Sequence, residues 1–134
     1  MKFRDCVIRL VFKFDGARAI DVSFVKPSRE TQREHVCRLS MSLDSLKLYA
    51  QTGMAKTTKN ILIAEKPLRL VGGRTYVVLI EAVGSEFVAQ LDTGDVVRGS
   101  HELLAVEKTS LNLGISGSSG VIDDLKLWSA AAKQ

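Results

Sequence analysis

In Arg4-Asp5-Cys6-Val7-Ile8-Arg9-Leu10-Val11-Phe12-Lys13-Phe14, an apolar residue occupies every second position from Cys6 onward, and Arg9 and Lys13 fall between them. Successive side chains of a β-strand point to opposite faces, so this period of two predicts a strand with one buried face. Asp15-Gly16 is a turn sequence, and the alternation returns at Ile20, Val22 and Phe24. The two segments therefore predict a β-hairpin.

A second hairpin is predicted together with its register. If Gly84-Ser85 is a two-residue turn, Val83 faces Glu86, and the pairs that follow are Ala82 with Phe87, Ile80 with Ala89 and Val78 with Leu91. These six residues make one face wholly apolar. The reverse face is mixed, because it pairs Glu81 with Val88, Leu79 with Gln90 and Val77 with Asp92.

The rest of the chain also has the pattern of short strands. Strands are expected at 35–41, 45–51, 61–66 and 111–116, with a short one at most at Val96-Val97 and an irregular segment from His101 to Lys108. The last strand is expected from Val121, with either a bulge near Asp123-Asp124 or burial on both faces. No segment has a sustained helical period. Residues 1–134 are therefore expected to form one all-β domain, an antiparallel two-sheet β-sandwich of the jelly-roll type.

Composition excludes several classes of protein. With 46% hydrophobic and 25% charged residues among 134, the chain is not disordered or low-complexity. The net charge is +4, but the basic residues are scattered, and only the pairs Lys56 with Lys59 and Arg29 with Arg33 approach a cluster. We therefore expect no nucleic-acid partner. No apolar stretch approaches the roughly 20 residues of a membrane span, and the N-terminus lacks the pattern of a signal peptide.

The two cysteines carry little chemical information. Cys6 and Cys37 are too few for a disulfide scaffold, and neither lies in a motif with zinc spacing. We expect both to be buried as small apolar residues, and a bridge between neighbouring strands is the alternative.

The segment Gly120-Val121-Ile122-Asp123-Asp124-Leu125-Lys126-Leu127-Trp128 resembles the closing strand of concanavalin A-like lectin/glucanase domains. Further segments occur in the order seen in the bacterial 3-keto-disaccharide hydrolase-like branch of that superfamily: 5–14, 35–39, 73–78 leading into 87–92, and 108–116. The resemblance implies a jelly-roll fold, a carbohydrate ligand and export to the periplasm or the cell exterior. Members of this branch usually carry upstream strands, so the resemblance also implies an open sheet edge that could form a homodimer by strand addition.

The carboxylates do not match the catalytic pattern of the family. Laminarinase-type glucanases of this fold carry Glu-x-Asp-x-x-Glu on one strand, and this sequence has no such run. Glu86 and Asp92 share a face by parity but lie about 20 Å apart in a strand, beyond either glycosidase geometry. A two-carboxylate glycosidase is therefore disfavoured. Asp124 matches a position near the structural calcium of related glucanases, but a calcium site needs about six oxygens that the sequence does not supply, so no cofactor is predicted.

Candidate binding residues come from the polar sides of the strands. Arg9, Arg38 and Lys47 would line one basic face if their strands are adjacent, and Tyr49 is the best exposed aromatic residue for stacking against a sugar ring. Tyr76 and Trp128 are the other aromatic candidates, with Trp128 favoured as core or edge packing. His101 and Glu102 lie in an irregular segment at a strand end, where binding groups are often displayed.

The function predicted from these residues is carbohydrate binding by an accessory module rather than a complete enzyme. Two alternatives stay open at this stage. One is a hydrolase of 3-keto-disaccharides or related glycosides, as the resemblance implies, and the other is a structural module that assembles through an open sheet edge.

Overall fold

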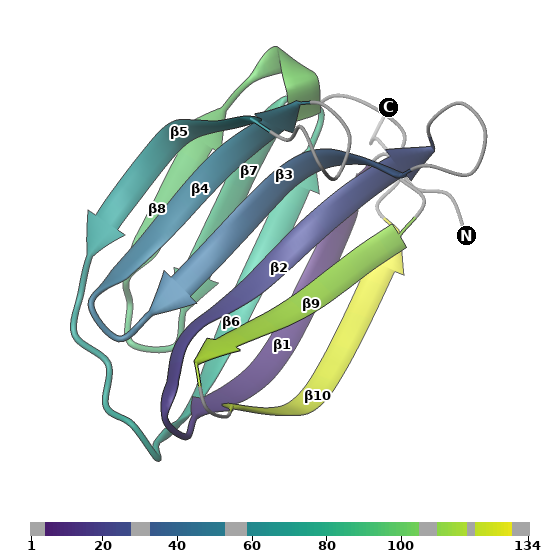
Figure 1. The fold of residues 1–134 in the computed structure, drawn as a ribbon. Helices are drawn as coiled ribbons and strands as arrows, with labels where there is room; N and C mark the ends of the chain where they lie inside the picture. Colours follow the sequence, from purple (N-terminus) through teal and green to yellow (C-terminus); the bar gives the residue numbers. More distant parts are fainter. Residues whose placement is uncertain (1–4, 28–32, 53–58, 105–109, 118–119, 130–134) are drawn as a thin grey trace.

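Two five-stranded antiparallel sheets pack face to face in the computed structural model, which describes residues 5–27, 33–52, 59–104, 110–117 and 120–129 (Figure 1). One sheet has the strand order β10-β1-β6-β7-β8 and the other the order β5-β4-β3-β2-β9. The strands are β1 (Cys6–Phe14), β2 (Ala17–Pro27), β3 (Arg33–Ser42), β4 (Ser45–Thr52), β5 (Lys59–Pro67), β6 (Thr75–Val83), β7 (Glu86–Leu91), β8 (Val96–Ser100), β9 (Ser110–Gly117) and β10 (Gly120–Ser129). The predicted β-sandwich is therefore confirmed.

The hairpin of β6 and β7 has the register that the sequence predicts. Val83 pairs with Glu86, and the pairs along the strands are Ala82 with Phe87, Ile80 with Ala89 and Val78 with Leu91. All six of these apolar residues are buried. Gly84 has φ of 57°, a left-handed conformation that two-residue hairpin turns require and that glycine adopts without steric cost.

The core lies between the two sheets. Every second residue of β1 is buried, from Cys6 through Phe14, as the period of two predicts. Phe24 of β2 and Phe87 of β7 meet across the core, with ring centroids 6.1 Å apart and an interplanar angle of 68°. Such an edge-to-face pair adds about 0.5–1.5 kcal/mol beyond the burial of its area, so it helps to hold the two sheets together.

The closing strand contains the predicted bulge. Val11 of β1 pairs with Asp124, and the next residue, Phe12, pairs with Ile122, so Asp123 is the extra residue. The bulge explains the change of parity in this strand. Leu125 and Leu127 pair with inward-facing residues of β1, whereas Trp128 pairs with Val7 and lies on the outer face.

Strand β8 is longer than predicted. It runs for five residues to Ser100, because Ser100 and Gly99 continue the pairing with Glu86 and Phe87 of β7. A short 3₁₀ helix, η1 (Glu102–Leu104), follows in the segment expected to be irregular. A Cβ at Gly99 would lie 2.5 Å from Cγ2 of Ile63. The lack of a side chain at Gly99 therefore lets β8 pass close to β5.

The N-terminal core strand is not a sheet edge. Within the described residues β1 lies between β10 and β6, and the edge strands are β10, β8, β5 and β9.

Cys6 and Cys37 are buried thiols on β1 and β3, which belong to different sheets, so they do not lie on neighbouring strands. Arg29 and Lys56 of the sparse basic clusters lie outside the described residues. No helix in the described part of the chain is long and apolar enough to cross a membrane.

Candidate functional site

The outer face of the sheet β5-β4-β3-β2-β9 carries two cross-strand rows of mostly polar residues, which we call the polar face. The pairing of the strands aligns the residues of each row. From β9 to β5, the first row is Asn112, Ser23, Arg38, Tyr49 and Leu62, and the second is Gly114, Asp21, Ser40, Lys47 and Glu65. The residues between them on β2, β3 and β4, including Val22, Leu39 and Leu48, are buried in the core. The alternation of each strand therefore sorts apolar residues inward and polar residues onto this face.

Arg38 and Tyr49 form the centre of the polar face. They are directly paired on β3 and β4, and the guanidinium carbon of Arg38 lies 4.9 Å from the centroid of the Tyr49 ring. This is a cation–π contact, which stabilises by about 0.5–1 kcal/mol at a partly exposed site. The Nε atom of Arg38 is buried and has no hydrogen-bond partner among the described residues. The contact therefore holds the arginine beside the aromatic ring, and its Nε donor is left without a hydrogen bond to any described residue.

Asp21 supplies an acceptor in the second row. Its Oδ1 atom is buried and makes no hydrogen bond within the described part of the chain. Its neighbour on β9 is Gly114, and a Cβ built there would come no closer than 3.9 Å, to Cβ of Asp21. A buried polar atom without a partner is costly, and water or a ligand hydroxyl can satisfy it. Because Gly114 has no side chain, β9 places no side-chain atom beside Asp21 at this position.

The charges of the polar face balance. Nζ of Lys47 lies 3.7 Å from Oε2 of Glu65, and both side chains are partly exposed. Arg38 and Lys47 are thus matched by Asp21 and Glu65. The predicted basic face is wrong in this respect, because the sequence argument did not include the two carboxylates.

Arg9 does not join Arg38 and Lys47, as the sequence interpretation had supposed. Strand β1 belongs to the other sheet, so Arg9 lies on the opposite outer face, paired with Leu79 of β6. Its Nη1 atom lies 3.6 Å from Oδ2 of Asp124. Asp124 is therefore next to a cation, and no group of three metal-ligating side chains occurs among the described residues.

His101 and Glu102 lie outside both rows. The backbone N–H of His101 donates to the carbonyl of Ser85 at 2.9 Å, and its own carbonyl accepts from Leu104 at 3.0 Å. Leu104 of η1 is buried in the core, where the short helix contacts β3 and β4. These two candidates therefore lie where β8 ends, apart from the residues on the polar face.

The other two aromatic candidates have different environments. Tyr76 is buried, and its hydroxyl accepts a 2.7 Å hydrogen bond from the backbone N–H of Val71. It therefore anchors the segment before β6 and is not a surface platform. Trp128 is exposed on β10, on the outer face of the sheet that carries Arg9.

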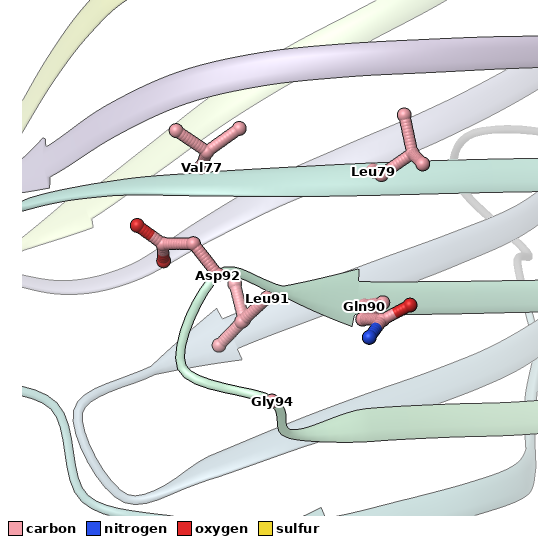
Figure 2. A pocket seen from close by; sticks show the side chains of 6 residues that line it. All are labelled: Val77, Leu79, Gln90, Leu91, Asp92 and Gly94. Carbon is pink, nitrogen blue, oxygen red and sulfur yellow. The ribbon is translucent and has the colours of Figure 1, made fainter.

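Two hollows lined by described residues lie away from the polar face. One, of about 280 Å³, lies on the outer face of the sheet containing β6 and β7 (Figure 2). Val77 and Leu79 line it together with the polar side chains of Gln90 and Asp92. The other, of about 380 Å³, lies at the turns between β1 and β2 and between β3 and β4. None of the six predicted binding residues lines either hollow. We favour the polar face because its two rows present more hydrogen-bonding side chains than either hollow. The hollow in Figure 2 has Gln90 and Asp92, and the hollow at the turns has Arg18, Ser42 and Asp44.

Several members of the polar face are not among the residues predicted from the sequence. Asp21 and Ser23 alternate with Ile20, Val22 and Phe24, so their outward direction could be read from the sequence. Asn112 alternates in the same way with Leu111 and Leu113. What the sequence did not contain was the order of strands, which brings β9 beside β2 and β5 beside β4.

The same β-sandwich fold occurs in solved structures of a carbohydrate-binding module and of galectins. CBM66, a carbohydrate-binding module from Bacillus subtilis, superposes with a TM-score of 0.66 at 15% identity, covering 96% of this chain and 78% of the other. Chicken galectin 2 gives 0.65 at 11% identity, covering 96% and 100%. Sheep galectin-11, solved in complex with glycerol, gives 0.59 at 10% identity, covering 93% and 90%. No protein-family model and no curated protein sequence matches this chain.

At these identities the similarity establishes the fold and not the ligand. The neighbours share a jelly-roll β-sandwich with this chain, as the resemblance of the closing strand implied. The narrower similarity to 3-keto-disaccharide hydrolase-like domains is not confirmed by them. Function must therefore be argued from the residues of the polar face.

Proposed function

We propose that this chain is a carbohydrate-binding module that holds a neutral glycan on its polar face. The observation that carries the proposal is the Arg38–Tyr49 pair, with its 4.9 Å cation–π contact, at the centre of two polar rows. A sugar offers hydroxyls that both donate and accept, and C–H faces that pack on aromatic rings. The polar face offers matching groups: donors on Arg38 and Lys47, acceptors on Asp21 and Glu65, and the ring of Tyr49.

The balanced charge favours a neutral ligand. Two cations and two carboxylates share the face, and Lys47 is already within 3.7 Å of Glu65. An acidic glycan would approach carboxylates as well as cations, so it would gain little electrostatic attraction overall. The fold neighbours support the choice of ligand class, since one of them is a carbohydrate-binding module by name.

Binding without hydrolysis is supported by the separation of the carboxylates. Asp21 on β2 and Glu65 on β5 lie in one row with β3 and β4 between them. Three strand spacings of about 4.8 Å place the two backbones about 14 Å apart. Retaining glycosidases need about 5–5.5 Å between carboxyl groups and inverting enzymes about 6.5–9.5 Å. These two residues therefore do not fit the catalytic pair of a glycosidase, including one acting on 3-keto-disaccharides.

The test compares two arginines on opposite outer faces, Arg38 on β3 and Arg9 on β1. The wild-type chain is first applied to an array of neutral and acidic glycans, and the affinity for the best ligand is then measured by calorimetry. Arg38→Gln is compared with Arg9→Gln, which removes a guanidinium from the outer face of the other sheet. We expect Arg38→Gln to weaken binding at least about tenfold, because hydrogen bonds from charged donors contribute about 1.5–3 kcal/mol. Arg9→Gln should leave the affinity within about twofold, since it touches no residue of the proposed site.

Two results would count against the proposal. Absence of binding to any glycan at millimolar concentration would remove the ligand class. Equal effects of the two arginine substitutions would show that the glycan binds somewhere other than the polar face.

A further inference from the structure

The edge strand β10 exposes large apolar side chains. It pairs on one side only, with β1, so its other side is open among the described residues. Three of its large apolar residues are well exposed: Val121 at 39%, Leu125 at 38% and Trp128 at 48%. Unpaired backbone groups on an edge strand are a template for another strand. This edge therefore combines open backbone groups with apolar side chains.

The charges on β10 are poorly matched within one copy of the chain. Lys126 pairs directly with Arg9 of β1, and like charges in directly opposed positions are destabilising. Asp124 lies diagonally across and reaches Arg9 at 3.6 Å. Lys126 has no ion pair with a described residue. An acidic residue on the open side of β10 would therefore give Lys126 a partner that the described residues of one copy do not supply.

We propose that β10 pairs antiparallel with β10 of a second copy of this chain, on a two-fold axis through Leu125, to form one continuous ten-stranded sheet. A two-fold axis perpendicular to the sheet leaves outward side chains outward and inward side chains inward. Residues that face each other across the axis are therefore both outward or both inward. This requires the axis to pass through a residue and not between two residues. The choice among residues is set by charge. An axis at Asp124 or at Lys126 would oppose two like charges. An axis at Leu125 places Asp124 of each copy opposite Lys126 of the other.

The bulge makes the rest of the strand agree with this register. Asp123 is the extra residue of the bulge, so the pairing of β10 with β1 skips it. The pairing of β10 with the second copy should skip it in the same way, which shifts the register by one for the residues before Asp124. Val121 then faces Trp128 of the second copy, and both are exposed apolar residues on the outer face. Ile122 faces Leu127 of the second copy, and both belong to the inner side. One register thus pairs opposite charges and, on each face, apolar residues with apolar residues.

The experiment is a charge swap read by sedimentation equilibrium on the full chain. The variants are Lys126→Asp, Asp124→Lys and the double variant Asp124→Lys/Lys126→Asp. Each single variant turns two attractive pairs per dimer into repulsive ones, so we expect the dissociation constant to rise at least about tenfold. The double variant recreates opposite charges across the axis and should return the constant to within about threefold of the wild type.

Folding is checked separately by circular dichroism and thermal unfolding of each variant. Lys126→Asp places a carboxylate directly opposite Arg9, so the single copy should be no less stable than the wild type. A wild-type chain that sediments as a monomer at about 100 micromolar would overturn the proposal, because a specific interface should be populated there. So would a dimer that ignores the single substitutions, or a double variant that stays as weak as the singles. None of these results bears on glycan binding, which uses the outer face of the other sheet.

Discussion

The two outer faces of the sandwich differ although their strands follow the same alternating rule. On the sheet β5-β4-β3-β2-β9, the outward residues of the central strands are Asp21, Ser23, Arg38, Ser40, Lys47 and Tyr49. On the sheet β10-β1-β6-β7-β8, the outward residues around Arg9 include Val7, Val11, Val77 and Leu79. Each face has an arginine near its centre. Arg38 lies against an aromatic ring, whereas Arg9 lies beside Leu79 and the carboxylate of Asp124.

The difference shows that an outward arginine has no fixed role. Arg9 and Arg38 both occupy polar positions in alternating strands, and the sequence pattern treated them alike. Their surroundings differ because the sheet order gives each arginine different neighbours. Four substitutions would sharpen or break this contrast between the faces.

The largest expected effect comes from filling the space beside Asp21. Gly114→Tyr places a ring on the polar face at a position where a Cβ meets nothing closer than 3.9 Å. Glycan binding should be lost, because the ring covers the carboxylate, while the unfolding temperature should stay the same or rise, since tyrosine favours strands more than glycine does. Calorimetry and thermal unfolding measure the two effects. Gly114→Ala is the control and should keep most of the affinity; unimpaired binding by Gly114→Tyr would place the ligand elsewhere.

Removal of the aromatic ring should have the next largest effect. Tyr49→Ala deletes the stacking surface and the partner of Arg38, so the glycan affinity should fall about tenfold and the stability by about 0.5–1 kcal/mol. Tyr49→Phe keeps the ring and should retain most of both. If Tyr49→Phe were as weak a binder as Tyr49→Ala, the hydroxyl rather than the ring face would be the essential group.

A substitution on the opposite face should affect stability alone. Leu79→Ser replaces a leucine that is 40% exposed beside Arg9 and should lower the free energy of unfolding by at most about 1 kcal/mol. Glycan affinity should not change. Chemical denaturation and calorimetry on the same preparation separate the two quantities, and a fall in affinity would mean that the hollow in Figure 2 takes part in binding.

The smallest effect concerns the turn between β3 and β4. A 2.7 Å hydrogen bond from the Ser42 hydroxyl is the main cause that lowers the pKa of Asp44 below its usual 3.8. A carboxyl with a lowered folded-state pKa contributes stability above its unfolded pKa, and this contribution is lost as the pH falls through the folded value. Ser42→Ala should therefore reduce the dependence of stability on pH below about pH 4. The free energy of unfolding, measured between pH 2 and pH 5, tests this prediction. Asp44→Asn is the control, because the contribution of this carboxyl is absent in it. If Ser42→Ala and Asp44→Asn both kept the pH profile of the wild type, the prediction would be wrong.

The sequence predicted much of the fold. The register of β6 and β7 followed from six apolar residues and one two-residue turn, because a slip by one would have mixed the faces. The bulge at Asp123 followed from a change of parity within β10. The length of β8 did not follow, since Arg98, Gly99 and Ser100 have no apolar alternation, and their pairing with β7 depends on the neighbouring strand.

The candidate site was predicted in part. Arg38, Lys47 and Tyr49 do lie together, because β3 and β4 form a hairpin that is local in sequence. Arg9 was predicted beside Arg38 and Lys47 but lies on the outer face of the other sheet. Asp21 and Glu65 lie on the polar face but were not among the predicted residues. Tyr76 was an aromatic candidate for the surface although it shares the parity of Val78 and Ile80, which predicts an inward side chain. The structure buries it, and its hydroxyl accepts a hydrogen bond from the backbone N–H of Val71.

The sequence by itself determined which side of each strand is apolar, since the period of two is a property of the backbone and needs no partner. Only the tertiary structure decided which strands share a sheet, because the order β5-β4-β3-β2-β9 joins segments that lie far apart in the chain. The first depends on local geometry, and the second on long-range pairing that buries both inner faces at once. The order of the strands decides which residues surround Arg38 and Lys126, so both proposals depend on the tertiary structure.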